Sequence, residues 1–166
     1  MIQLIMLFFS LAIATAGFAQ TVKSTEQFSA PAKYAIQANA GKRTTQVSLS
    51  ANEDLFLKQV EILSKCVAHW KSEALEVEIH GDDHDYFTVV ILIHKKEFQV
   101  KFLWDSDHFE DVPVITPASA TLSLSSDDFK KGRTIDGNLK MKGDCKGGPC
   151  HNAKIEIDGD FAFTIP

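Results

Sequence analysis

The segment "SANEDLFLKQVEILSKCVAHWKSE" (residues 50–73) decides the fold class, because it carries the clearest helical periodicity in the chain. Its large apolar side chains recur at steps of four, three, four and three residues, the spacing of one helix face: Phe56, Val60, Leu63, Val67 and Trp70. Ser50 or Asn52 can cap the exposed amides at the start. Glu53 and Asp54 complement the helix dipole in the first turn. The segment therefore predicts an amphipathic α-helix.

After this segment the apolar period changes to two, the period of a β-strand. Residues 75–79 alternate between apolar and acidic side chains, and residues 97–104 alternate again. Residues 86–94 are apolar on both faces after Thr88, as in a central strand. The intervening "HKKE" is short enough for a hairpin turn, and "TLSL" (121–124) resumes the strand pattern. We therefore expect an α+β fold, with one amphipathic helix packed on a mainly antiparallel β-sheet.

Two similar phrases, "TIDGNLKM" (134–141) and "EIDGDFAF" (156–163), occur near the C-terminus. A two-residue hairpin turn at each Asp-Gly would mix polar and apolar residues on both faces, which the rules of strand register disfavour. Continuous strands instead place the apolar residues and both glycines on one face. The sequence therefore predicts two long strands, each with a glycine in its apolar row.

The register of these two strands can also be predicted from their apolar faces. Pairing positions whose numbers sum to 296 sets Gly137 opposite Gly159 and leaves a dent where another element could pack. The polar face then gathers three carboxylates and one amide, from Asp136, Asn138, Asp158 and Asp160. Such a face is either solvated or holds Ca²⁺, which binds oxygen ligands.

The loop between the two long strands reads "CKGGPC" (145–150) and supplies two of the three cysteines. In an oxidising compartment, cysteines at the ends of two hairpin arms favour a disulfide. A zinc site needs four ligands, and Cys150 and His151 point to opposite faces of a strand. We expect a Cys145–Cys150 disulfide, with free thiols or a metal as alternatives. Cys66 lies beside the predicted helical stripe and is interpreted as a small buried hydrophobe.

The N-terminal segment has the features of a secretory signal peptide, although it lacks a basic n-region. Residues 1–19 carry no charge and end in a small-x-small pattern at Gly17 and Ala19. We expect cleavage there, an irregular arm over residues 20–44 and a single domain over residues 45–166. After cleavage the protein would be secreted or periplasmic and free of the membrane. The net charge of −5, without a Lys/Arg cluster, argues against a nucleic-acid partner.

A second polar concentration, "HGDDHD" (80–85), contains candidate metal ligands. His80, His84 and Asp85 together could bind a divalent ion such as Zn²⁺. The segment also has the composition of an acidic hairpin turn, which requires no metal. We expect no cofactor, and Ca²⁺ or Zn²⁺ are the alternatives.

No nucleophile motif or phosphate-binding loop occurs in the chain, which favours binding over catalysis. We therefore expect an exported, non-catalytic module that binds a protein or a small ligand. Trp104 and Phe109 are candidate contact residues, because exposed aromatic side chains beside a loop favour partner binding. The alternatives are a metal-dependent hydrolase that uses the 80–85 cluster and a Ca²⁺-stabilised adhesion domain at the cell surface.

Overall fold

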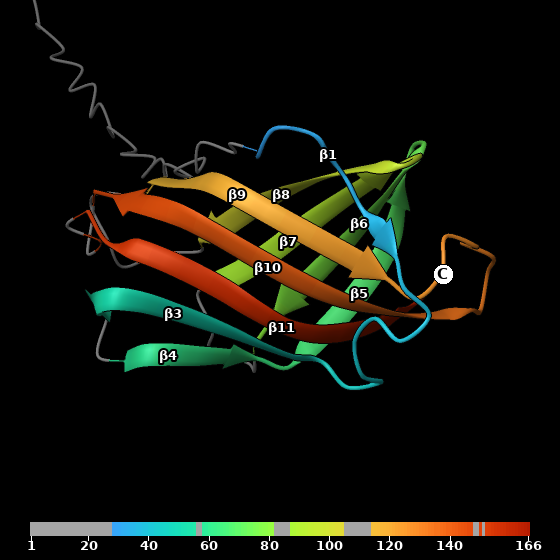
Figure 1. The fold of residues 1–166 in the computed structure, drawn as a ribbon, viewed down its shortest axis with the longest axis horizontal. Coiled ribbons are helices and arrows are strands. Elements are labelled where there is room, and N and C mark those ends of the chain that lie inside the picture. The colour runs from blue at the N-terminus through green and yellow to red at the C-terminus, as the bar shows by residue number, and fades with distance from the viewer. Residues whose placement is uncertain (1–27, 56–57, 82–86, 105–113, 148–149, 151) are drawn as a thin grey trace, which may run out of the picture.

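The computed structural model describes residues 28–55, 58–81, 87–104, 114–147, 150 and 152–166, without the side chains of 52–55, 58–61 and 104. The chain forms two β-sheets that stack as two layers, with their strands running obliquely to each other (Figure 1). None of the described segments forms a helix long and apolar enough to span a membrane. The described part of the chain contains strands and no α-helix, so the predicted α+β fold is wrong.

Five strands form the first sheet, and each pair of adjacent strands within it is antiparallel. Their order across the sheet is β1 (Ala32–Lys33), β8 (Glu97–Trp104), β7 (Phe87–His94), β6 (Ala74–His80) and β5 (Lys65–Lys71).

The second sheet has six strands. Adjacent strands within it are antiparallel, except for β2 and β9, which pair parallel. The order is β2 (Ala35–Ile36), β9 (Val114–Leu124), β10 (Thr134–Lys146), β11 (Lys154–Thr164), β3 (Gln46–Leu55) and β4 (Lys58–Leu63).

The predicted helix at residues 50–73 corresponds to the end of β3, all of β4 and all of β5. At Ser64 the chain leaves the six-stranded sheet and enters the five-stranded sheet. This transition shifts the inward-facing positions from odd to even, so that Leu63 and then Cys66 contribute to the same core. Of the predicted helical stripe, Leu63 on β4 is buried, whereas Val67 and Trp70 on β5 are 48% and 46% exposed. Val67 pairs with Glu78 and Trp70 pairs with Leu75, so the two side chains lie on opposite faces of β5. The predicted stripe therefore combines residues of two strands that share no common face.

The core lies between the inner faces of the two sheets. The alternating row of β6 is buried as predicted, through Leu75, Val77 and Ile79. The apolar rows of β10 and β11 also face the core, which confirms the two long strands. Their buried members are Ile135, Leu139, Met141, Ile155, Ile157, Phe161, Phe163 and Ile165.

The register of β10 and β11 differs from the predicted one by two residues. Gly137 lies opposite Phe161, and Gly159 lies opposite Leu139, so the paired positions sum to 298. Both registers keep the apolar residues on one face, because a two-residue shift preserves the alternation. The predicted opposition of the two glycines is therefore wrong, although their common face is correct.

A disulfide joins Cys145 and Cys150, whose Cα atoms lie 5.5 Å apart. Both cysteines are fully buried, and the predicted bridge is confirmed. The disulfide is compatible with an oxidising compartment. The predicted signal peptide (1–19) lies outside the described residues.

Candidate functional site

A cleft of about 350 Å³ lies between the two sheets at one end of the molecule. The β5–β6 turn, the β7–β8 turn and the loop after β9 meet at this end, on the right in Figure 1. Its lining combines aromatic, aliphatic and charged side chains: Tyr34, Trp70, Glu73, Leu75, Ile93, Lys95, Lys96, Asp127 and Phe129.

The apolar part of the cleft is a row of side chains across three neighbouring strands. Trp70 pairs with Leu75, and Leu75 pairs with Ile93, so all three face the core side of the sheet. Leu75 and Ile93 are buried, whereas Trp70 is 46% exposed. The difference follows from β5 being the edge strand, which leaves one side of the indole without a neighbouring strand. The row therefore ends in an accessible aromatic ring.

Tyr34 lies between the two sheets, because β1 pairs with β8 and β2 pairs with β9. Its hydroxyl donates a hydrogen bond of 2.9 Å to the carbonyl oxygen of Lys95. Burial raises the pKa of Tyr34 above its ordinary value; the charge of Lys96 acts to lower it and that of Asp127 to raise it. Tyr34 therefore stays a neutral hydroxyl whose position is fixed by the β7–β8 turn.

The rim of the cleft carries charges of both signs. Lys96 and Asp127 form an ion pair that bridges the β7–β8 turn and the loop after β9. The hydrogen bond between them raises the pKa of Lys96 and lowers the pKa of Asp127. Because this pair neutralises itself, the rim favours a ligand without strong net charge.

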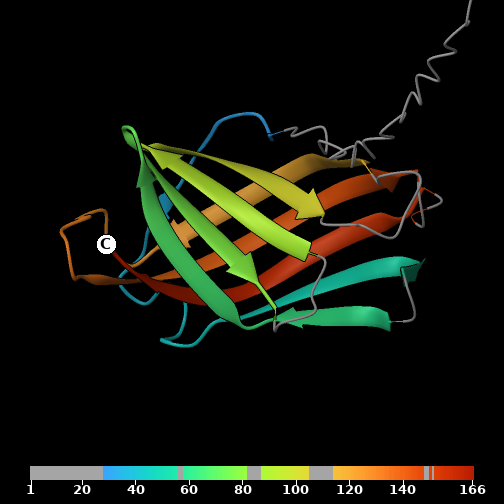
Figure 2. The ribbon, with the colours of Figure 1, turned by 180° about the vertical axis from the view of Figure 1, so that it is seen from behind.

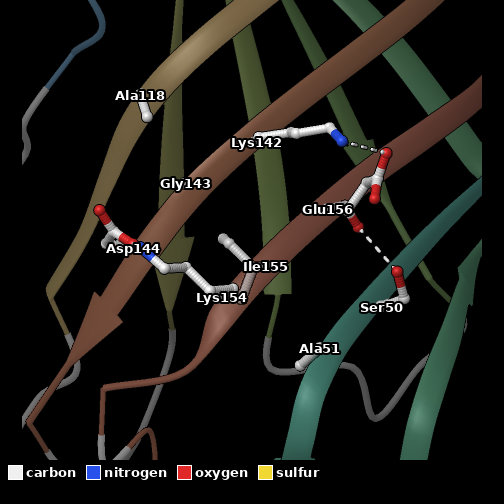
Figure 3. A pocket seen from close by; sticks show the side chains of 9 residues that line it. All are labelled: Ser50, Ala51, Ala118, Lys142, Gly143, Asp144, Lys154, Ile155 and Glu156. Atoms are coloured by element: carbon white, nitrogen blue, oxygen red, sulfur yellow. Dashed lines mark hydrogen bonds and ion pairs between the residues drawn. The ribbon is translucent and has the colours of Figure 1, made fainter.

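A second depression, of about 500 Å³, lies on the outer face of the six-stranded sheet (Figure 3). It forms where an irregularity between Lys142 and Gly143 disturbs the pairing of β9 with β10. Its charged side chains pair with one another, Lys142 with Glu156 at 3.4 Å and Lys154 with Asp144. No aromatic ring lines this depression. A small apolar ligand would therefore find less contact area here than beside Trp70.

The residues predicted to bind Ca²⁺ lie on the polar face of β10 and β11. The Asn138 amide donates to a carboxylate oxygen of Asp160 at 2.9 Å, so the structure brings these two together. Asp158 instead forms an ion pair with Lys140, whose Nζ lies 3.1 Å from Oδ2 of Asp158. One carboxylate oxygen of Asp136 is buried and has no hydrogen-bond partner among the described residues. The four side chains are thus divided among different contacts.

The other predicted site residues are only partly described. His80 ends β6, and its Nδ1 lies 3.2 Å from the Gly81 carbonyl oxygen. His84, Asp85 and Phe109 lie outside the described residues, as does the side chain of Trp104. These predictions remain untested.

The periodicity of the sequence does not single out Tyr34 or Phe129 as site residues, and it predicts Trp70 to lie on a helix. The signal for Trp70 is the alternation of residues 66, 68 and 70, which becomes visible only if the chain changes sheet before residue 65. Comparisons with family models, with curated proteins and with solved structures gave no match.

Proposed function

We propose that the protein is an exported binding module that holds a small, planar and largely apolar ligand in the cleft beside Trp70. The half-exposed indole next to the buried Leu75 and Ile93 carries this proposal. Large aromatic side chains are usually covered in a monomer, and an accessible one in a concave site offers a stacking surface. The predicted signal peptide and the disulfide support a secreted or periplasmic location.

The dimensions and charge of the cleft support a small ligand over a protein partner. Its volume of about 350 Å³ is near the lower end of the range for small-molecule sites. The Tyr34 hydroxyl and the Lys96–Asp127 pair already have partners, so they offer a polar rim without an unpaired buried charge. A ligand with an aromatic body and one weakly polar end matches this arrangement.

Titration with N-phenyl-1-naphthylamine, an uncharged aromatic probe that fluoresces in apolar sites, tests the proposal. We expect saturable binding to the protein, and Trp70→Ala should weaken it about tenfold through loss of the stacking surface. Trp70→Phe retains an aromatic ring and should have a smaller effect. Val114→Ala is the matched control, because Val114 is an exposed apolar residue in β9 that does not line the cleft.

Circular dichroism must show that each variant retains the fold of the wild type. Equal probe affinity for wild type and Trp70→Ala would contradict the proposal, as would an effect of Val114→Ala as large as that of Trp70→Ala. Lack of saturable binding to the wild type would also contradict it.

A further inference from the structure

A histidine and two glutamates gather on the outer face of the β5–β6 hairpin, on the surface that faces the viewer in Figure 2. His69 on β5 lies directly opposite Glu76 on β6, and Glu78 follows two residues later on the same face. Trp70 points to the opposite side of the sheet, so this cluster is separate from the cleft.

The donor atoms of the cluster lie at distances suited to a shared metal ion. His69 Nε2 is 2.9 Å from Glu76 Oε1 and 3.7 Å from Glu78 Oε1. The three donor atoms all lie within 4.8 Å of one another. Nitrogen and oxygen ligands each about 2.1 Å from one zinc ion lie at most about 4.2 Å apart. Small side-chain movements would therefore place all three around one ion.

Burial makes one ligand rigid and leaves the others accessible. The Glu76 side chain is 7% exposed, whereas that of Glu78 is 32% exposed and that of His69 is 47% exposed. An ion held here would have a fixed carboxylate on one side and access to water on the other. Three protein ligands with an open position are the arrangement found in accessible zinc sites.

The local charge also permits a cation. Glu76 and Glu78 supply two negative charges. Lys71 lies 3.4 Å from Glu76, and the charge of the buried Lys101 also acts on Glu76. The Lys71 side chain is 65% exposed, so it can move into solvent when an ion replaces it. Mixed imidazole and carboxylate ligands favour Zn²⁺ and related transition metals over Ca²⁺, which requires more oxygen ligands.

We propose that His69, Glu76 and Glu78 form a binding site for one divalent transition-metal ion of the Zn²⁺ class, with its outer side open to solvent. The site lies on the outer face of the same hairpin that supplies Trp70 to the cleft. It does not depend on the ligand proposed for that cleft.

Calorimetric titration of Zn²⁺ into metal-free protein, purified without a polyhistidine tag, tests the site. We expect one ion per chain, and His69→Ala and Glu78→Gln should each weaken binding by at least about tenfold. Co²⁺ in place of Zn²⁺ should give a visible absorption band that is lost in the same variants. Both substituted residues are partly exposed, so folding should survive, and circular dichroism checks this.

Two histidine controls distinguish this cluster from other binding modes. His94 Nε2 lies 3.7 Å from Glu73 Oε2, in a pair of one histidine and one glutamate. His94→Ala should therefore leave the affinity of the His69 cluster for Zn²⁺ unchanged. His80 is the residue of β6 two positions beyond Glu78, but it is not one of the three residues whose donor atoms lie within 4.8 Å of one another, so His80→Ala should also leave Zn²⁺ affinity unchanged. The proposal is overturned if the wild type shows no saturable Zn²⁺ binding, if His69→Ala binds as tightly as wild type, or if His80→Ala removes the binding.

Discussion

Glu76 is a carboxylate enclosed in the outer surface of the five-stranded sheet, with 5% of the residue exposed. Burial acts to raise its pKa, but hydrogen bonds from His69 and Lys71 and the charges of Lys71 and Lys101 outweigh burial and lower it. Lys101 is also buried, and its Nζ lies 4.9 Å from the centre of the Phe28 ring. The negative charge is therefore stabilised by neighbours on two other strands and supports the native state.

The lowered pKa of Glu76 predicts a contribution to acid stability. Its pKa is about 4.3 in an unfolded chain, so its contribution is fully present above that value and is lost as pH falls through the lower native pKa. Glu76→Gln should cost roughly 1–2 kcal/mol of unfolding free energy at pH 7. As pH falls below about 4.3 toward the lower native pKa, the stabilities of variant and wild type should converge.

Urea unfolding in the presence of EDTA, repeated from neutral to acidic pH, measures this effect without a bound metal ion. Glu73→Gln makes the same chemical change at an exposed side chain and should follow the wild-type curve. A stability difference between Glu76→Gln and wild type that stayed constant down to acidic pH would argue against the role of the charge.

At the scale of elements, the two strand glycines show how close packing shapes the six-stranded sheet. A Cβ atom at Gly137 would lie 2.4 Å from the end of the Phe161 ring, which covers that glycine from the opposite strand. A Cβ atom at Gly159 would lie 2.3 Å from the Gln46 carbonyl oxygen on β3. The predicted dent is therefore filled, by a ring at one glycine and by backbone at the other.

These different neighbours predict different costs for the same substitution. Gly159→Ala should lower the unfolding free energy by roughly 3 kcal/mol, because strand backbone must move, and Gly137→Ala by about 1 kcal/mol, because a ring can shift. Phe161→Leu should offset part of the cost of Gly137→Ala and none of the cost of Gly159→Ala. Urea unfolding of the single and double variants gives these values. Equal losses, or equal compensation by Phe161→Leu, would show that the two glycines share one environment.

The sequence was informative about elements that remain within one sheet. Strands β6 and β8 and the apolar rows of β10 and β11 followed from alternation, and β7 followed from a run that is apolar on both faces. The turn at residues 94–97 followed from the short segment between β7 and β8. Alternation identifies a strand's inner face but leaves its register open by steps of two residues, which explains the error in the pairing of β10 with β11. The change of sheet at Ser64 shifts the inward positions from Leu63 to Cys66 and Ala68, so residues 50–73 show no continuous alternation. The helical spacing of Leu63, Val67 and Trp70 was then misleading, because Val67 and Trp70 lie on opposite faces of β5.

The candidate sites were harder to predict, because both depend on pairing across strands. Glu76 and Glu78 were recognised as the polar row of a strand, but His69 joins them only when residues 65–71 form the opposite strand. The two-residue turn at 72–73, with Ser72 at a φ of 59°, sets that register without a glycine to mark it. Tyr34 and Phe129 line the same cleft as Trp70 but are distant from it in the sequence, so local periodicity carries no information about the cleft.

At the scale of the whole molecule, the β5–β6 hairpin combines the two proposed sites. Its inner face supplies Trp70 to the cleft, and its outer face supplies His69 and Glu76 to the proposed metal site. β5 is an edge strand, where Lys65 and Lys71 at its two ends discourage pairing with another chain. The hairpin can therefore present side chains on both faces while it stays anchored to the shared core through Leu75.

The shared core predicts that the two sheets unfold together. Leu139 on β10 is fully buried in the six-stranded sheet, and Leu139→Ala should lower the unfolding free energy by about 2–4 kcal/mol. In a Trp104→Phe background, Trp70 fluorescence reports on the five-stranded sheet, whereas far-ultraviolet circular dichroism reports on both sheets. Because the inner faces form one cluster, both signals should shift to the same lower midpoint.

Lys140→Ala, at the adjacent exposed position, should change stability by at most about 1 kcal/mol. Separate transitions, or a Trp70 signal unaffected by Leu139→Ala, would show that the sheets are independent units.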